Sequence, residues 1–402
     1  MRILGTFTLA AAFLLALAVA ERQPAVQAAG GPLESTSDSY RVLAPIESGN
    51  LLLFPVVRAG ARSSGDSPFI TLDEGIKNGE VEVTEAGRVR GLVRPRGGTP
   101  PFQDNHYRGD QVNTLVLLNN SKQPLLLLAG EIVTGGKQDR VIAKDRIVPA
   151  GGDPIDLSVF CIEPGRWTES SPTFGGAAKS SVNSFMVQPT VREQAMVSKN
   201  QQQVWDSVHG SIAGMMAAPA PAASLGPAVE SGGPIAISRA PATTSYAKVM
   251  QESEVSKKVD EAAAPVMKSR DQVLAQLRQE HAIGVVVAIR GELVWADIFA
   301  DTDLLSRYWT KLVRSYAAES LTAGDTHTAP TVADAQHFLN APSAGAETSE
   351  GDVGVYRYRE IKSLGTETFV LESLLPGTGF DVHISKLKLR SDQGHFKPQI
   401  YR

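Results

Sequence analysis

The chain has 402 residues, of which 42% are hydrophobic and 20% are charged, and its formal net charge is -4. Loss of Arg2 with an N-terminal signal would make the charge -5, and such a mildly acidic chain has no basic field to collect phosphates. Nucleic acid is therefore not expected as a partner. The single cysteine, Cys161, excludes an internal disulfide, so stability must come from a packed core.

The N-terminus predicts an export signal. Arg2 is the only charge before a largely apolar run from Ile3 to Ala20, which closes on the small residues that a signal peptidase accepts. Cleavage after Ala20 would begin the mature protein at Glu21. A second small-residue site ends at Ala28, and an uncleaved anchor stays open because the run approaches the length of a membrane span. We expect an exported, periplasmic or secreted protein that meets a membrane only through an uncleaved signal.

The first elements expected in the mature chain are short. Residues 51–57 form an apolar run fit for a buried strand, and Pro55 within it suggests an edge or an end of a sheet. Thr71 followed by Glu74 is a capping-box pattern, which predicts a short helix. Alternation from Val81 to Thr84 then predicts a strand.

Closely spaced strands follow in the next part of the chain. They are expected at 112–118, 125–128, 140–142, 147–149 and 155–162. Turn-forming residues at 119–121 and 150–153 separate them. Short strands joined by tight turns favour an antiparallel sandwich or barrel-like sheet, so the expected fold class is α+β with an antiparallel β core.

The rest of the chain mixes helices, a biased segment and strands. Helices are expected at 191–212, ended by Gly214, at 246–281 with a break at Pro265, and at 304–321; a hairpin at 283–299 and strands at 353–361, 367–375 and 381–389 complete the pattern. The Ala/Pro/Ser/Gly-rich residues 215–245 are expected to be disordered. The resulting plan has a signal peptide (1–20), a flexible segment (21–45), a β core with its helix (46–214), a low-complexity insert (215–245) and a part that completes the same domain (246–402).

Several segments are similar to a known family. The central ones are Leu128-Ala129-Gly130-Glu131, Gly136-Lys137-Gln138-Asp139-Arg140, Val148-Pro149-Ala150 and Cys161-Ile162-Glu163-Pro164-Gly165-Arg166-Trp167. Together with looser matches at 71–83, 284–297 and 312–317, the chain resembles the ARG and Rhodanese-Phosphatase-superfamily-associated protein domain. The resemblance implies an α+β domain and a link to nucleotide or ADP-ribose chemistry, without a mechanism. This chain differs from the intracellular setting of the family's associations, because it carries a predicted export signal.

Polar groups in the first of these segments surround a flexible turn. Glu131 would serve as a general base if partly buried. Lys137 and Arg140 would hold an anion together with Gln138. The backbone N–H groups of Gly135 and Gly136 would add an anion nest. The alternative is structural: a glycine-rich hairpin in which Glu131 and Lys137 form a surface ion pair. Both interpretations stay open at this point.

A second group of polar residues follows the last strand of the β core. Arg166 offers a planar fork for phosphate or carboxylate, and Trp167 offers a face on which a base or sugar could stack. Equally, Glu163 could pair with Arg166 internally while Trp167 closes the core. If both groups of polar residues bind a ligand, they line one shared site, made of Glu131, Lys137, Gln138, Arg140, Glu163, Arg166 and Trp167.

Other reactive residue types point to structure. Cys161 follows apolar residues in a predicted strand, which favours a buried structural thiol. The seven histidines show no paired spacing typical of zinc, and no nucleotide fingerprint, P-loop or nucleophile elbow occurs, so neither a metal nor a cofactor is expected. Asp297 and Asp301 are interpreted as a helix-start cap.

Two function classes are left by the sequence. One is a non-catalytic exported module that binds a small polar or anionic molecule, such as a nucleotide or ADP-ribose. The other is a hydrolase-like enzyme acting on an ADP-ribose-type or other phosphorylated molecule, with Glu131 as base and Lys137, Arg140 and Arg166 as anion holders. The two classes differ in whether these groups converge in one concave pocket.

Overall fold

The computed structural model describes residues 40–58, 67–85, 114–166, 168–176, 185–218, 243–268, 270–322, 324, 326–378 and 381–389. These residues belong to one compact unit. The expected signal peptide, most of the segment 21–45, most of the insert 215–245 and Trp167 lie outside the described residues. No helix in the described part of the chain is both long and apolar enough to cross a membrane.

The chain order of the elements is as follows. The strands are β1 (Tyr40–Val42), β2 (Ile46–Ser48), β3 (Leu51–Arg58), β4 (Ile70–Thr71), β5 (Val81–Glu85), β6 (Thr114–Asn119), β7 (Leu125–Leu127), β8 (Ile132–Gly135), β9 (Arg140–Ile142), β10 (Arg146–Val148), β11 (Ile155–Cys161), β12 (Phe174–Gly176), β13 (Ala282–Ile289), β14 (Glu292–Phe299), β15 (Ala346–Asp352), β16 (Tyr356–Ser363), β17 (Thr366–Ser373) and β18 (Asp381–Lys388). The helices are α1 (Leu72–Lys77), α2 (Pro189–Glu193), the π-helix η4 (Gln194–Ser198), α3 (Gln201–Ala217), α4 (Tyr246–Gln251), α5 (Ser253–Ala262), α6 (Ala264–Lys268), α7 (Arg270–Gln279), α8 (Thr302–Leu321) and α9 (Val332–Asn340).

The large sheet has the strand order β1-β3-β13-β14-β18-β17-β16-β15, with β2 also paired to β3, and each pair is antiparallel. The central hairpin of this sheet is β13–β14, as expected. Arg290 and Gly291 form its two-residue turn, in which both take positive φ angles (52° and 81°). Pro55 does not mark an edge, since β3 is paired on both sides. It lies where the outer partner changes from β2 to β1, at a point where no N–H is needed.

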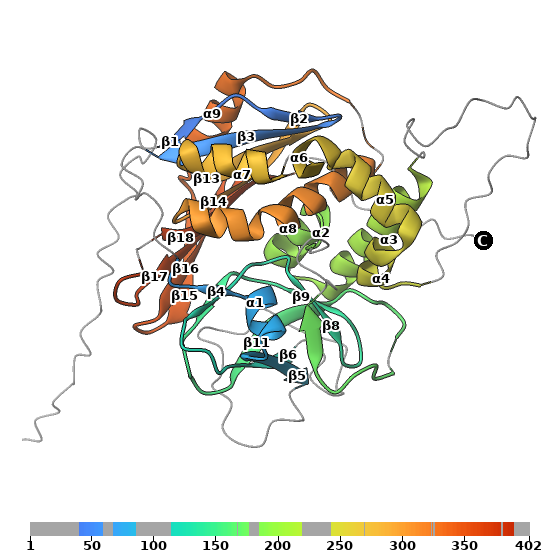
Figure 1. Cartoon of the computed structure of the whole chain (residues 1–402), viewed down its shortest axis with the longest axis vertical. Helices are drawn as coiled ribbons and strands as arrows, with labels where there is room; N and C mark the ends of the chain where they lie inside the picture. The colour runs from blue at the N-terminus through green and yellow to red at the C-terminus, as the bar shows by residue number, and fades with distance from the viewer. Residues whose placement is uncertain are drawn as a thin grey trace, which may run out of the picture. The chain divides into compact units, whose positions relative to one another are not determined.

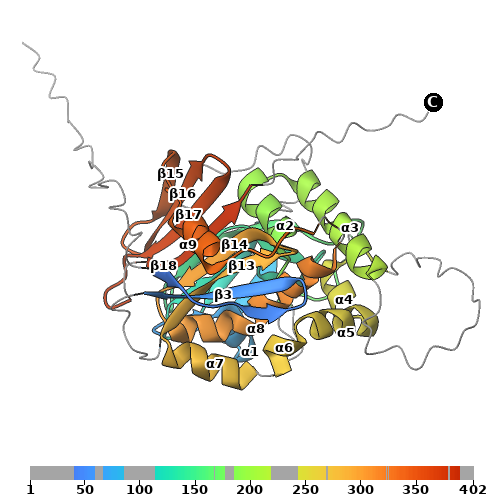
Figure 2. The same ribbon diagram turned by 90° about the horizontal axis from the view of Figure 1, so that it is seen from above.

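Helices cover the two faces of this sheet differently (Figures 1 and 2). Alternate residues of β3 and β13, such as Leu53 and Val287, pack into the main core, to which α8 contributes Leu312. The opposite face packs Phe54 against Phe338 of α9. One face of the large sheet is therefore covered by α8 and the other by α9.

A second, barrel-like sheet has the order β12-β8-β9-β11-β6-β5, and its pairs are antiparallel. An isolated bridge between Thr84, in β5, and Thr173, just before β12, nearly closes it. A small sheet, β10-β7-β4, stands beside α1. The expected class, α+β with an antiparallel barrel-like core, is confirmed.

The helices differ from the expectation in several places. The segment expected as a helix at 246–281 with a break at Pro265 is divided into α4, α5, α6 and α7, and α9 was not expected. The segment expected as one helix at 191–212 is divided into α2, η4 and α3, because Lys199 takes a positive φ of 51° and Asn200 caps α3 by accepting N–H groups of its first turn. Gly214 does not end α3, which continues to Ala217. The capping box is confirmed: Thr71 and Glu74 bond reciprocally at the start of α1.

Candidate functional site

Glu131 lies in the turn before β8 and is 0% exposed. Its Oε1 is 2.6 Å from Nζ of Lys311 in α8, and its Oε2 accepts the N–H of Leu128 at 2.8 Å. Oδ2 of Asp73 in α1 lies 2.8 Å from the same Lys311 ammonium. The expected surface pair of Glu131 with Lys137 is therefore wrong: Glu131 joins the barrel-like sheet to α8 instead.

The charged groups of this cluster shift one another's pKa values. Burial opposes the charged form of Lys311, but the carboxylates of Asp73 and Glu131 outweigh it and raise the pKa of the ammonium above its usual range. Burial also raises the pKa of Glu131, against the attraction of Lys311. The cluster thus keeps Lys311 protonated, and both oxygens of Glu131 already have partners within the protein.

The tip of the β8–β9 hairpin holds the glycines of the predicted anion nest. Gly135 and Gly136 take positive φ angles of 135° and 49°. The N–H of Gly135 donates to Oδ1 of Asp139 at 3.1 Å, and the N–H of Lys137 donates to Oε1 of Glu85 at 3.0 Å. These backbone donors therefore bind carboxylates, as a nest does, but the carboxylates belong to the protein.

Arg166 lies over the same tip. Its Nη1 donates to the carbonyls of Gly136 (3.0 Å) and Thr168 (2.8 Å), and its Nη2 lies 2.5 Å from Oε2 of Glu163 and 3.4 Å from Oδ1 of Asp139. The internal pairing of Glu163 with Arg166, one of the two expected alternatives, is present. The guanidinium fork therefore holds the turn in place.

The start of α4 completes this cluster. Ser245, which caps α4, donates to Oδ2 of Asp139 at 2.6 Å, and Nζ of Lys248 lies 3.1 Å from Oε1 of Glu163. Burial raises the pKa of Asp139, and the Ser245 hydroxyl opposes that shift. The tip thus connects β8, β9 and α4 through charged and hydroxyl groups.

Gln138 and Arg140 point to different roles at this tip. Nη1 of the fully buried Arg140 donates to the carbonyl of Gln138 at 2.6 Å, and its Nη2 lies 3.9 Å from Oε1 of Glu85. The side-chain amide of Gln138 is also fully buried, yet neither its oxygen nor its nitrogen has a hydrogen-bond partner among the described residues. Such a group is rare in folded proteins and calls for a partner.

The sequence-predicted residues are divided between two places. Lys137, Gln138, Arg140, Glu163 and Arg166 lie at the hairpin tip. Glu131 precedes the other end of β8, a four-residue strand that spans about 10 Å, and shares no hydrogen-bond or ion-pair partner with Arg166 in the described part of the chain. Trp167 lies outside the described residues.

A third charged cluster was not expected from the sequence. Nδ1 of His383 in β18 lies 2.6 Å from Oδ2 of Asp145, and Nε2 lies 3.2 Å from Oδ1 of Asp297 in β14. Oδ2 of Asp297 accepts Nη1 of Arg192 at 2.8 Å, and Oδ1 accepts the hydroxyl of Ser385 at 2.8 Å. All of these side chains are buried. Asp297 is thus not a helix cap, whereas Asp301 does cap α8 by accepting the N–H of Leu304.

The charges of this cluster stabilise one another. Burial disfavours both the Asp297 carboxylate and the His383 imidazolium, but the pairing overcomes it. Arg192 and His383 hold the pKa of Asp297 well below its usual range. Asp145 and Asp297 raise the pKa of His383 to about 9. The imidazole is therefore an ion-pair partner at neutral pH and not a neutral general base.

Comparison with protein families agrees with the resemblance seen in the sequence. The family model of the ARG and Rhodanese-Phosphatase-superfamily-associated Protein domain (ARPP-1) matches residues 39–387. The chain belongs to the ARPP-1 family. No curated protein and no solved structure matches the chain.

In this ARPP-1 domain, the segment from Leu128 to Glu131 connects the buried clusters. The N–H of Leu128 binds Glu131, while the N–H of Ala129 donates to Oδ1 of Asp145 at 2.7 Å. Gly130, with a φ of 94°, lies against Arg192: a Cβ atom built there would come within 3.0 Å of its Cδ. The motif that the sequence pointed to for chemistry therefore joins two buried ion clusters.

The contacts of Cys161 and of the described histidines and carboxylates are typical of structural residues. Cys161 is buried in β11 of the ARPP-1 domain, as expected, and both its N–H and its carbonyl bond the side-chain amide of Gln201 at 2.9 Å. Among the described residues, no group of three or more His, Cys, Asp or Glu side chains is arranged to hold a metal ion. Asp145 and Asp297 instead flank opposite nitrogens of His383.

Proposed function

We propose that the mature protein works outside the cytoplasm as a binding protein for a small anionic molecule, held at the tip of the β8–β9 hairpin. The observation that carries the proposal is the buried amide of Gln138 without a hydrogen-bond partner among the described residues. Such an amide costs about 1–3 kcal/mol, so a ligand group that pairs with it would stabilise the fold. Export is supported by the apolar run after Arg2.

An exposed cation at the tip favours an anion. The described side chains there balance in charge, with four cationic residues (Lys137, Arg140, Arg166 and Lys248) and four carboxylates (Glu85, Asp139, Glu163 and Glu169). The preference for a negative ligand therefore depends on the accessible ammonium of Lys248. Lys248 has a side chain that is 55% exposed, so its ammonium can turn from Glu163 to a bound molecule.

The contacts assign different roles to the predicted residues. Arg166 and Arg140 bind carbonyls and carboxylates of the tip, so they position the turn. Gln138 and Lys248 are the groups proposed to meet the ligand. An ADP-ribose-type or other phosphorylated molecule is the first class to test, because its phosphate oxygens accept bonds from both an amide and an ammonium. The family description associates this domain with a phosphatase superfamily, which agrees with that choice.

The hydrolase alternative has less support. It uses Glu131 as the general base, and both oxygens of that carboxylate are already bound, one by Lys311 and one by the Leu128 N–H. A general base must come within hydrogen-bond reach of its substrate. Binding is therefore the better proposal for the tip.

Calorimetric titration of the mature protein with ADP-ribose, AMP and inorganic phosphate tests the proposal. Gln138→Met keeps the length of the side chain and removes the amide. We expect this variant to lose the response to the ligand while its melting temperature is unchanged or higher, because an unpaired buried amide is gone. Lys248→Ala should weaken binding about fivefold, equivalent to ~1 kcal/mol.

Lys257→Ala is the matched control. Lys257 is an exposed lysine of the neighbouring helix α5, paired with Glu261 as Lys248 is with Glu163, and its loss should leave binding unchanged. If no anionic probe binds the wild type, or if Gln138→Met and Lys248→Ala bind as the wild type does, the tip is a structural element only.

A further inference from the structure

The large sheet ends on an open strand, β15. Its seven residues pair with β16 along their whole length, from Ala346 opposite Lys362 to Asp352 opposite Tyr356, without a bulge. In the described part of the chain, no strand pairs with the other side of β15, and Figure 2 shows it as the outermost strand at its end of the sheet. Residues 346–349 are exposed. Such an edge can accept another strand.

The turn at the end of β15 shows which of its backbone groups face the open side. The carbonyl of Asp352 accepts the N–H of Val355 in this turn, and the carbonyl of Val355 accepts the N–H of Leu374 on the β17 side. Asp352 therefore faces β16. Because successive residues of an antiparallel strand face opposite sides, the N–H and C=O groups that face away from β16 are those of Glu347, Ser349 and Gly351. Among the described residues, no hydrogen bond reaches these groups across the open edge.

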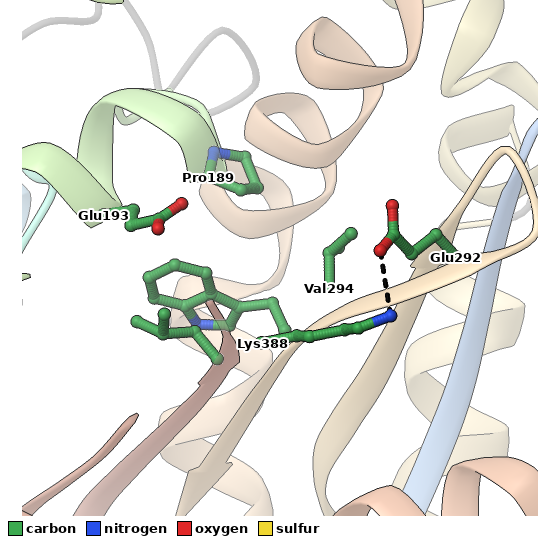
Figure 3. Close-up of a pocket in the computed structure, with 7 residues that line it drawn as sticks. Pro189, Glu193, Glu292, Val294 and Lys388 are labelled. Atoms are coloured by element: carbon green, nitrogen blue, oxygen red, sulfur yellow. Dashed lines mark hydrogen bonds and ion pairs between the residues drawn. The ribbon is translucent and has the colours of Figure 1, made fainter. Parts of the chain in front are cut away.

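The opposite end of the same sheet is covered. β1 has only three residues, and the side-chain amide of Gln336 in α9 accepts the N–H of Val42 at 2.8 Å and donates to the carbonyl of Tyr40 at 3.1 Å. This amide takes the place of a further strand. In the middle of the sheet, β14 is paired on both sides, and an ion pair of Glu292 with Lys388 adds to its contact with β18 (Figure 3). β15 is the longer of the two end strands, and it has no such cover within the described ranges.

The two glutamates of β15 are held by their own chain. Charged side chains commonly keep a second strand away from an edge strand. Both oxygens of Glu347 instead bind Arg359 of β16, at 2.7 and 2.9 Å, and Oε1 of Glu350 lies 2.7 Å from Nζ of Lys144. β15 contains no lysine and no proline. Neither glutamate therefore presents an unpaired charge to an approaching strand.

The order of residues in β15 fits a second copy of the same strand. An antiparallel pair centred on Ser349 joins residues 346–352 of both copies, and the three edge-facing residues then meet only one another, so their N–H and C=O groups are all paired. Each acidic residue lies opposite a small or hydroxyl-bearing residue of the other copy: Glu347 opposite Gly351, Glu350 opposite Thr348, and Asp352 opposite Ala346. No like charges are directly opposite, which favours the pair.

Exposed aliphatic side chains lie at both ends of the β15–β16 pair. Val353, in the turn between these strands, is 99% exposed, and Leu364, in the turn from β16 to β17, is 104% exposed. A twofold axis through Ser349 brings Val353 of one copy and Leu364 of the other to the same end of the joined sheet. Each end of the interface thus has apolar surface to bury.

We propose that β15 is a self-association edge, through which two copies of the protein form an antiparallel β15–β15 pair and one continuous sheet. The interface is small, because it consists of one strand from each copy and its flanking turns. The dimer is therefore a weak one that forms at micromolar or higher concentrations. The proposal does not depend on the hairpin tip, which lies on the barrel-like sheet.

Sedimentation velocity of the mature protein tests the association. Concentrations of about 1 μM and about 200 μM bracket the affinity expected of a small interface, and the protein should sediment as a dimer at the higher one. Hydrogen exchange resolved to single amides locates the contact. The amides of Glu347, Ser349 and Gly351 should exchange more slowly at the higher concentration, whereas those of Thr348 and Glu350, which face β16, should not change.

Three variants of one residue separate the edge from the rest of the fold. Ser349→Pro removes an N–H that faces the open side and leaves the bonds to β16 in place, and Ser349→Lys puts two like charges opposite each other at the twofold axis. Each should weaken dimerisation at least about tenfold while the melting temperature at low concentration stays that of the wild type. Ser349→Ala keeps the backbone groups and is the control, which should dimerise as the wild type does.

Three results would overturn the proposal. One is a wild type that stays monomeric at both concentrations. Another is a dimer that Ser349→Lys does not weaken, because the copies then meet through a different surface; this result counts even if Ser349→Pro does not fold. The third is equal protection of the edge amides at both concentrations, since another segment of the same chain then covers β15.

Discussion

Nδ1 of His383 lies 2.6 Å from Oδ2 of Asp145, and both side chains are fully buried. His383 belongs to β18 of the large sheet, whereas Asp145 lies between β9 of the barrel-like sheet and β10 of the small sheet, so the pair joins the large sheet to the other two. Asp145 also accepts the N–H of Ala129. The loss of this ion pair should therefore be visible in the stability of the whole fold.

The pair predicts a loss of stability at alkaline pH. The pKa of His383 is raised from 6.5 to about 9, so the folded state holds the proton more tightly than the unfolded chain. The contribution is fully present below pH 6.5 and is lost as the pH rises through 9. The two values correspond to about 3 kcal/mol at most. Urea unfolding between pH 6 and 9.5 measures this slope.

His383→Gln provides the comparison for that slope. The variant cannot titrate, so its free energy of unfolding should be lower at pH 6 and should change less toward pH 9. An equal slope in wild type and variant would show that another group carries the pH dependence.

The Glu131–Lys311 pair predicts unequal effects of its two partners. Lys311→Met leaves the buried Glu131 and the partly exposed Asp73 without their ammonium, which should cost about 3–5 kcal/mol. Glu131→Gln leaves Lys311 paired with Asp73, so it should cost less, about 1–3 kcal/mol. Urea denaturation measures both. Lys257→Met, on the exposed face of α5, is the control and should change stability by less than ~0.5 kcal/mol. Equal losses for Lys311→Met and Glu131→Gln would contradict a shared ammonium.

Local sequence signals predicted local structure well. Thr71 and Glu74 of the capping box are three positions apart, and the turn at Arg290 and Gly291 depends on its own backbone, so neighbouring residues determine both. The partner of Glu131 lies 180 positions away in α8, and no local pattern indicates it. The sequence therefore identified Glu131 as an important residue but offered it either a catalytic role or a surface partner, Lys137.

The third cluster was missed for the same physical reason. His383 and Asp145 are 238 positions apart, and only the packing of β18 against the turn after β9 brings them together. One available signal was the strand pattern, because Asp297 and Ser385 occupy inward-facing positions of two predicted apolar strands, where an unpaired polar residue is not tolerated. That pattern predicts buried partners, although not their identity.

Export predicts a defined mature N-terminus. Cleavage after Ala20 should give a soluble exported protein that begins at Glu21, because the small residues there precede the first charges. These residues lie outside the described part of the chain. N-terminal sequencing of the exported fraction checks this, and an intact Met1 in that fraction would contradict cleavage.

A methyl group added at Gly130 predicts a loss of stability that reaches the Arg192 cluster. A Cβ atom there would lie 2.8 Å from Cε of Met186 and 3.0 Å from Cδ of Arg192, and its φ of 94° disfavours any other residue. Gly151→Ala is the matched control, since Gly151 also has a positive φ, 55°, but a Cβ atom there meets nothing within 4 Å.

Gly151→Ala should cost only the backbone strain, about 1 kcal/mol. Gly130→Ala should cost at least about 2 kcal/mol more, because Arg192 must move and its bonds to Asp297 and Ser385 lengthen. Urea unfolding gives both values. Displacement of Arg192 should also change the stacking on Trp295, so the tryptophan fluorescence of folded Gly130→Ala should differ from that of Gly151→Ala. Equal stability and equal spectra in the two variants would show that the Leu128–Glu131 segment does not hold Arg192 in place.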